Sequence, residues 1–253
     1  MNKHFSGDTA VLTGRSMRHI TRSPDTIITT AIMPVALLLL LDYVFGGAIK
    51  HGSQTYVTYL LPGILLITIA SGISYTALRL FTDMQGGIFG RFQSMPIARS
   101  SVLWSHVLTS LAANLISLVA VVLVAVAMGF RSGAGALAWL AVAGILILFT
   151  LALTWIAVIA GLSAKTADGA GAFSYPLIFL PFISSAFVPT ATMPGPVRAF
   201  ADNQPVTSSV NTIRDLLAQH PVSTSIWTAL AWCLGILVAA YALAMATYHR
   251  KTA

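Results

Sequence analysis

The chain has 253 residues, of which 57% are hydrophobic and only 8% are charged. A soluble protein carries about a quarter charged residues, so this composition excludes an ordinary soluble domain and indicates a surface that mostly faces lipid. The net charge of +7 does not indicate nucleic-acid binding, because the basic residues flank apolar segments instead of clustering on a polar domain. Cys233 is the one cysteine, which excludes an internal disulfide.

Six apolar stretches are long enough to cross a membrane, which takes about 20 residues in a helix. They are residues 26–45, 56–78, 102–128, 136–162, 172–188 and 226–248. Residues 1–22 are polar and lack the apolar core of a cleavable signal peptide, so we expect the first apolar stretch to be retained. The fifth stretch is short and contains Pro176 and Pro181, which predicts a kinked or broken helix because each proline removes a backbone donor.

The distribution of Lys and Arg predicts the orientation, because cytoplasmic loops carry an excess of basic residues. If the N-terminus is inside, ten of the 14 Lys and Arg residues are cytoplasmic: Lys3, Arg15, Arg18, Arg22, Arg79, Arg91, Arg99, Lys165, Arg250 and Lys251. Lys50, Arg131, Arg198 and Arg214 then lie outside. We therefore expect an all-α integral membrane protein of one domain, with six transmembrane helices and both termini in the cytoplasm.

The polar segment 82–99 joins the second and third spans and contains three glycines. As a helix it places Ile88, Phe92 and Met95 on one face, and Pro96 ends it. Such a segment is either an interfacial helix on the lipid surface or a docking element for a soluble partner, and the residues alone leave both open. Because the segment joins two spans, a partner that pushes on it would move both.

A second distinctive segment, 189–225, precedes the last span and holds five of the 11 prolines. After Pro205, which can start a helix, one helical face carries Val206, Val210, Ile213 and Leu217. We expect one or two short amphipathic helices here, either dipping into the outer leaflet or packed over the bundle of spans.

Nothing in the sequence indicates an energy source within this chain. Asp42, Arg79 and His106 lie near the ends of their spans, which favours interface residues over an ion relay. The stretch GLSAKT at 161–166 lacks the glycine before the lysine that a phosphate loop requires. The six histidines lack metal-ligand spacing, and no Ser/His/Asp set lies at one depth. We therefore expect neither an enzyme nor an autonomous pump, and no metal or cofactor bound by this chain.

Several stretches point to a known family. They are the basic segment 15–34 that runs into the first span, FGGAI at 45–49, LLPGI at 60–64, GRFQSMPIARSSVLWSHVL at 90–108 and NQPVTSSVNTIRDLL at 203–217. With them the chain resembles, over nearly its whole length, the membrane subunit of ABC exporters of the type-2 permease family, especially the daunorubicin-resistance-like drug exporters of bacteria.

The resemblance implies roles for three segments. The segment 82–99 would be a coupling helix that sits in a groove of a separate ATPase subunit, with roles for Asp83, Gly90, Arg91, Phe92, Pro96 and Arg99. Relatives often have glutamate at the first acidic position, whereas this chain has Asp83 and no glutamate. Residues 1–25 would form an amphipathic helix along the inner surface that also touches the ATPase, through Arg15, Arg18 and Arg22. The segment 189–225 would form extracellular re-entrant helices that cap the transport path, with Asn203, Pro205, Thr207 and Arg214 in the matching motif.

The resemblance implies the permease subunit of an ATP-driven exporter in the bacterial plasma membrane. It would work as a dimer of permease chains, identical or not, with two ATPase subunits that bind ATP and Mg²⁺. The cargo would be a lipophilic drug, an antibiotic or a lipid-like molecule, in a path lined by the first, second and fifth spans. Candidates for that lining are Tyr43, Tyr75, Phe173, Tyr175 and Phe182, although each of these aromatics could instead pack between helices or lie at the membrane interface.

Two alternatives stay open from the residues. One is a permease for a polysaccharide or similar polymer, which a dense row of aromatic residues along one span would favour; no such row is visible. The other is a membrane scaffold or immunity protein that transports nothing and needs no ATPase.

Overall fold

The computed structural model describes residues 13–14, 24–46, 56–86, 99–221 and 224–252, and every regular element within these ranges is helical. The elements are α2 (Pro24–Leu40), η1 (Leu41–Phe45), α3 (Tyr56–Gln85), α5 (Arg99–Ala127), α6 (Ala136–Ser163), α7 (Ala167–Ala172), α8 (Ser174–Phe179), η2 (Leu180–Ile183), η3 (Thr190–Thr192), α9 (Gly195–Asp202), α10 (Pro205–Leu217) and α11 (Ser225–Thr252). The all-α prediction is confirmed for these residues.

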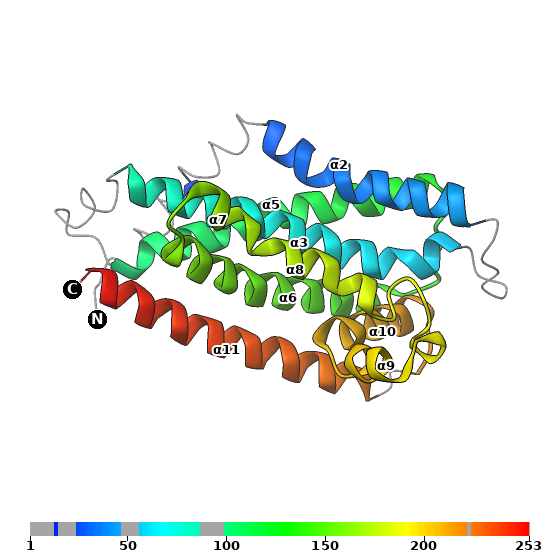
Figure 1. Ribbon diagram of the computed structural model, residues 1–253. Helices are drawn as coiled ribbons and strands as arrows, with labels where there is room; N and C mark the ends of the chain where they lie inside the picture. The colour runs from blue at the N-terminus through cyan, green and yellow to red at the C-terminus, as the bar shows by residue number, and fades with distance from the viewer. Residues whose placement is uncertain (1–12, 15–23, 47–55, 87–98, 222–223, 253) are drawn as a thin grey trace.

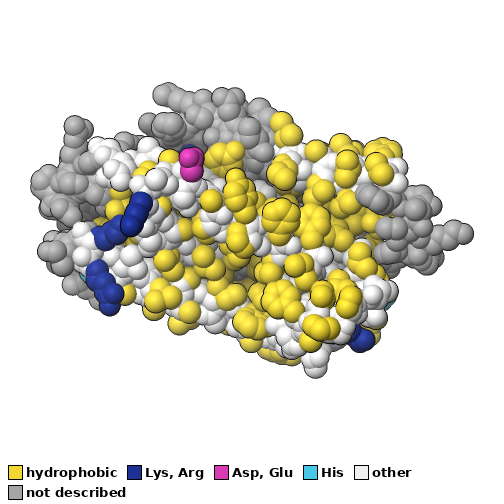
Figure 2. Space-filling view, viewed as in Figure 1, with side chains coloured by type: hydrophobic (Ala, Val, Ile, Leu, Met, Phe, Trp, Pro, Cys, Tyr) yellow, Lys and Arg dark blue, Asp and Glu magenta, His cyan; other side chains and the backbone are white. Residues whose placement is uncertain are grey.

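The long helices lie side by side and alternate in direction between two ends of the molecule (Figure 1). We call the end that carries α9 and α10 the cap end, and the end where α11 finishes the opposite end. Helix α3 occupies the centre of the bundle, since it packs against α2, α5, α6, α7, α8 and α10. Charged side chains lie towards the two ends of the face shown in Figure 2, with a broad hydrophobic surface between them.

Four helices are long and apolar enough to cross a membrane: Tyr56–Gln85, Ser101–Ala127, Ala136–Ser163 and Ser225–Lys251. The first and fifth predicted spans correspond to shorter apolar helical stretches, Ala31–Val44 and Ala167–Ile183. The predicted break in the fifth is present: α7 and α8 are separate short helices, and the chain turns into the 3₁₀ helix η2 beside Pro181. The count of six spans and the cytoplasmic placement of the termini stay predictions.

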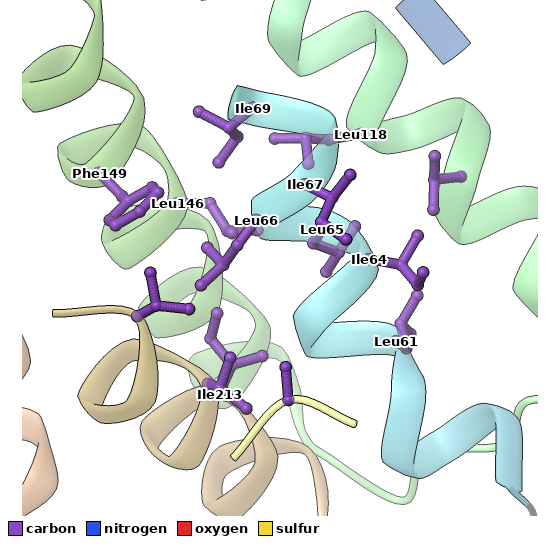
Figure 3. Close-up of a cluster of buried hydrophobic side chains, with 14 of the residues drawn as sticks. Leu61, Ile64, Leu65, Leu66, Ile67, Ile69, Leu118, Leu146, Phe149 and Ile213 are labelled. Carbon is purple, nitrogen blue, oxygen red and sulfur yellow. The ribbon is translucent and has the colours of Figure 1, made fainter. Parts of the chain in front are cut away.

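The core is built around the cap-end half of α3, whose apolar side chains point in every direction. Those labelled in Figure 3 meet side chains of α5, α6 and α10: Leu61, Ile64, Leu65, Leu66, Ile67 and Ile69 of α3 pack in one cluster with Leu118, Leu146, Phe149 and Ile213. A helix that is apolar all round belongs in an interior, which is where α3 lies. A second cluster at the opposite end joins α3, α5, α6 and α11 around Trp155.

Glycine allows α3 and α6 to approach closely near the opposite end. A Cβ added to Gly161 would lie 2.7 Å from the carbonyl oxygen of Ala77 and 3.1 Å from the Cβ of Leu80. Gly161→Ala should therefore force the two helices apart, which destabilises the bundle. Alanine also has a higher helix propensity than glycine, which offsets part of this cost, so we expect a net destabilisation of about 1 kcal/mol. The unfolding midpoint in detergent micelles measures this.

Gly144→Ala is the matched control for Gly161→Ala, because Gly144 lies on the same helix and an added Cβ would meet nothing within 4 Å. This control should be neutral or stabilising by up to about 1 kcal/mol. Equal midpoints for the two variants would show that the close contact of α3 with α6 does not matter for stability.

Candidate functional site

At the cap end, Arg214 of α10 is held against the start of α3. Its guanidinium lies over the ring of Tyr59, 3.9 Å from the ring centroid. Nη2 donates to the backbone carbonyls of Tyr59 at 3.2 Å and Ser185 at 3.1 Å, and Nη1 donates to Oδ1 of Asn211 at 3.3 Å. One side chain thus connects α10, α3 and the turn 184–187 that follows η2.

Among the described residues, no carboxylate lies within salt-bridge distance of Arg214, which is unusual for a buried cation. Burial lowers the pKa of the Arg214 guanidinium, and interactions with Tyr59 and Asp215 oppose that shift. Arginine nevertheless stays charged in proteins. The positive charge is therefore stabilised by carbonyl dipoles, an amide oxygen and an aromatic face, a combination that substitutes for a carboxylate.

Further hydrogen bonds fix the turn 184–187 to the cap. The Tyr59 hydroxyl donates to the Ser185 carbonyl at 3.2 Å, and the Ser185 hydroxyl donates to Oδ1 of Asn211 at 2.7 Å. The backbone N–H of Ser185 points to Oγ1 of Thr207 at 3.4 Å, and the side-chain amide of Gln204 donates to the Ile183 carbonyl. The turn is thus attached to α10 along two turns of that helix.

Helix α10 is packed over the bundle, one of the two arrangements that the sequence left open. The predicted apolar face, Val206, Val210, Ile213 and Leu217, is buried against α3, α6 and α11. The polar side chains Thr207, Ser208, Ser209 and Thr212 are buried as well. Ser132, between α5 and α6, donates to the Leu217 carbonyl at 2.9 Å, and Thr212 donates to Oγ of Ser225 at 3.2 Å. Helix α10 is therefore hydrogen-bonded to the α5–α6 connection and to the start of α11.

At the opposite end, a contact between an imidazole and a carboxylate joins the two helices that flank residues 87–98. Nε2 of His106 on α5 lies 3.2 Å from Oδ2 of Asp83 on α3. The His106 side chain is 6% exposed and that of Asp83 is 32% exposed. Arg79, one turn before Asp83, interacts electrostatically with the same carboxylate. The sequence did not predict this contact, because a position near a helix end does not reveal a partner on another helix.

Comparison with known proteins decides the family. The model of the ABC-2 type transporter family matches residues 8–218, which include the segment between α3 and α5 as well as α9 and α10. This chain belongs to the ABC-2 type transporter family. The predicted resemblance is thereby confirmed.

Two relatives of this ABC-2 permease carry names that concern drug resistance. The chain is 29% identical over 245 residues to the daunorubicin resistance ABC transporter permease protein DrrB1 of Streptomyces coeruleorubidus, covering 94% of this chain and 85% of the relative. It is 26% identical over 240 residues to the probable doxorubicin resistance ABC transporter permease protein DrrC of Mycobacterium tuberculosis, covering 92% and 85%. The chain is thus an ABC transporter permease of the membrane with drug-resistance relatives.

The predicted cap residues of this permease fall into two groups. Thr207 and Arg214 both contact the turn 184–187, whereas Asn203 is exposed and donates to the Ala199 carbonyl at 2.9 Å within α9. Pro205 begins α10, as its fixed backbone favours. The sequence missed Tyr59 and Ser185, because no local pattern links residues so far apart in the chain, and it missed Asn211 although Asn211 lies three residues before Arg214 on α10.

The predicted ATPase-coupling residues are only partly described. Gly90, Arg91, Phe92 and Pro96 lie outside the described residues, as do Arg15, Arg18 and Arg22. Arg99 is the first residue of α5, and Asp83 pairs with His106 within this chain. Contact of any of these residues with an ATPase stays a prediction.

The aromatic residues predicted for the transport path lie mostly on the outside of this protomer. Tyr43, Tyr75, Tyr175 and Phe182 are exposed, and Phe173 packs partly buried against the core. An apolar cavity of about 70 Å³ lies between α3, α6, α8, η2, α10 and α11, and none of the five aromatic residues lines it. Pockets that hold drug-sized ligands measure about 300–1,000 Å³, so this cavity is too small for such a cargo. A role for the five in transport stays a prediction.

Proposed function

We propose that this ABC-2 permease is the membrane-spanning subunit of an ATP-driven exporter that moves a lipophilic drug, antibiotic or lipid-like molecule out of the bacterial cytoplasm. The observation that carries this proposal is the family match over residues 8–218, which spans both the segment between α3 and α5 and the cap. The names of the relatives, which concern daunorubicin and doxorubicin resistance, favour a lipophilic drug over a polymer as cargo.

In this proposal the energy comes from a partner. A separate ATPase subunit binds ATP and Mg²⁺, and two permease chains assemble with two ATPase subunits in the plasma membrane. The permease contributes the path for the cargo and the segment 82–99 as the element on which the ATPase acts. The ATPase must bind two permease conformations with different free energies, since a partner with equal affinity for both would transmit no work.

The position of α3 makes such transmission physically reasonable. Helix α3 is continuous from Tyr56 to Gln85 and packs against most other elements of the bundle. Asp83 near one end meets His106, and Tyr59 near the other end meets Arg214. A displacement of the segment that follows α3 would therefore reach the cap through one helix.

Transport into vesicles tests the proposal. The permease is co-expressed with a candidate ABC ATPase subunit, the complex is purified and reconstituted, and ATP-dependent movement of daunorubicin is followed by its fluorescence. Arg91→Glu should leave the chain in the membrane and lower transport about tenfold or more, because a reversed charge at a docking surface costs at least the 1.4 kcal/mol that a factor of ten represents.

Arg131→Glu is the control for Arg91→Glu, since Arg131 is an exposed basic residue between α5 and α6 at the cap end. It should transport as well as the unmodified chain. Failure of the ATPase to co-purify, or daunorubicin movement that needs no ATP, would contradict the proposed function.

A further inference from the structure

The attachment of Arg214 depends on how three backbone segments are placed relative to one another. Two of its acceptors are main-chain carbonyls, one in the second turn of α3 and one in the turn 184–187. A third, the carbonyl of Ala186, lies at 3.5 Å, the outer limit of a hydrogen bond. Main-chain oxygens cannot follow the guanidinium by changing rotamer. A shift of about 1 Å between α3 and the turn would therefore separate Nη2 from one of its partners.

The attached state also leaves one donor of the guanidinium unsatisfied. Nε of Arg214 is buried and has no hydrogen-bond partner among the described residues. The guanidinium is therefore held through Nη1, Nη2 and its face over the Tyr59 ring, and not through Nε.

A second contact holds the same two segments together independently of Arg214. Gly63, one turn after Tyr59 on α3, faces Ala186, and a Cβ added to Gly63 would lie 2.6 Å from the Cβ of Ala186. The main chain of α3 therefore reaches the turn only because residue 63 has no side chain. This contact makes the approach of α3 to the turn testable without changing any charge.

From these contacts we propose that Arg214 is a positioning residue that latches the cap, α9 and α10, onto α3 and the turn 184–187, and that this latch opens in each transport cycle. The guanidinium holds the cap down while α3 and the turn are close, and it releases the cap when they separate. This inference rests on the proposed function for its link to transport. The latch itself is a property of the permease chain alone.

Hydrogen–deuterium exchange of the purified permease in lipid nanodiscs tests the latch without an ATPase. Arg214→Ala should raise the exchange rate of α10 backbone amides about tenfold, since local opening loses several charge-assisted hydrogen bonds, while exchange in α6 stays unchanged. Millimolar guanidinium ion should restore slow exchange in Arg214→Ala and have no effect on the unmodified chain. Arg214→Lys should fall between the two, because an ammonium lacks the planar fork.

Two further variants keep the test decisive. Gly63→Ala retains Arg214 but wedges the turn away from α3, so it should also speed exchange in α10, even if Arg214→Ala folds poorly. Arg198→Ala is the control: this exposed arginine of α9 pairs with Asp202 on its own helix at 3.5 Å, so its loss should leave α10 exchange unchanged. Unchanged α10 exchange in both Arg214→Ala and Gly63→Ala would overturn the latch.

The same variants separate the latch from the proposed function. In the reconstituted exporter, Arg214→Ala should raise the amount of ATP hydrolysed per daunorubicin moved several-fold, because a loose cap cannot enforce one direction. If exchange responds as expected but no ATP-dependent transport exists for any variant, the latch stands and the proposed function fails. If transport exists and ATP use per drug is unchanged in Arg214→Ala, the latch has no part in the cycle.

Discussion

Replacing Trp155 with alanine should destabilise the bundle by about 3 kcal/mol, which is the lower end of the range for a buried tryptophan. The Trp155 side chain is 1% exposed on α6. Its ring packs edge-on against Trp104 of α5, with centroids 5.3 Å apart and planes at 82°, and against Tyr241 of α11 at 4.8 Å and 88°. One ring therefore joins three long helices, and the alanine variant would leave a cavity between them.

The expected loss comes from packing and not from exposure to water. Lipid chains are as apolar as the protein interior, so a membrane gives little reward for burying a side chain. What disappears is the dispersion contact of a large ring and the edge-to-face geometry of two aromatic pairs. For this reason we expect the lower end of the range that soluble proteins show.

The unfolding midpoint in detergent micelles measures the Trp155 effect, with two variants for comparison. Trp227→Ala removes a tryptophan that is 72% exposed at the start of α11, and it should change stability by no more than about 0.5 kcal/mol. Trp155→Phe keeps an aromatic ring and should lose less than Trp155→Ala. A midpoint for Trp155→Ala equal to that of Trp227→Ala would refute the role of this cluster in joining the three helices.

Hydropathy located the long helices but could not rank them by burial. Helix α3 is the least apolar of the four long helices and yet the most buried, whereas α5 is more apolar and much less buried. In a membrane, helices that face lipid and helices that face the protein interior both carry apolar side chains, so hydropathy does not separate them. An interior helix is distinguished instead by small and hydroxyl residues, and α3 carries Gly63, Thr68, Gly72 and Thr76. Helix α6 carries the same kinds of residue, Gly144, Thr150, Thr154 and Gly161, so composition does not single out the central helix.

The local features of the cap were predictable and its attachment was not. A proline followed by a 3.6-residue apolar period was sufficient to place α10 and its buried face. The contacts of Arg214 join residues 155 and 29 positions apart in sequence, and they use backbone carbonyls that every residue possesses. No residue type or spacing marks such acceptors, so the sequence identified Arg214 without identifying Tyr59 or Ser185. The sequence analysis named both His106 and Asp83, but it did not pair them because they lie on different helices.

Replacing Asp83 with asparagine should lower daunorubicin transport by the reconstituted exporter about tenfold while ATP hydrolysis continues. The carboxylate near the end of α3 pairs with His106 near the start of α5, so it fixes the spacing of the two helices that carry residues 87–98 between them. Losing a charge-assisted hydrogen bond to a buried partner costs about 1.5 kcal/mol, and we take this lower end of the range because Asp83 is partly exposed. That energy corresponds to the factor of ten. Asp168→Asn, which alters an exposed carboxylate in the first turn of α7, should transport normally.

A double-mutant cycle with His106→Gln decides how Asp83 acts. If the two residues work as a pair, the double variant should lose no more transport than either single variant, because the first substitution already removes the interaction. Additive losses would contradict the pair. If Asp83 instead binds the ATPase directly, as the resemblance implies, Asp83→Asn should weaken co-purification of the ATPase and His106→Gln should not. If both variants retain the ATPase equally and lose transport equally, Asp83 acts through the contact between α3 and α5. That contact would then hold the segment 82–99 in place for the ATPase.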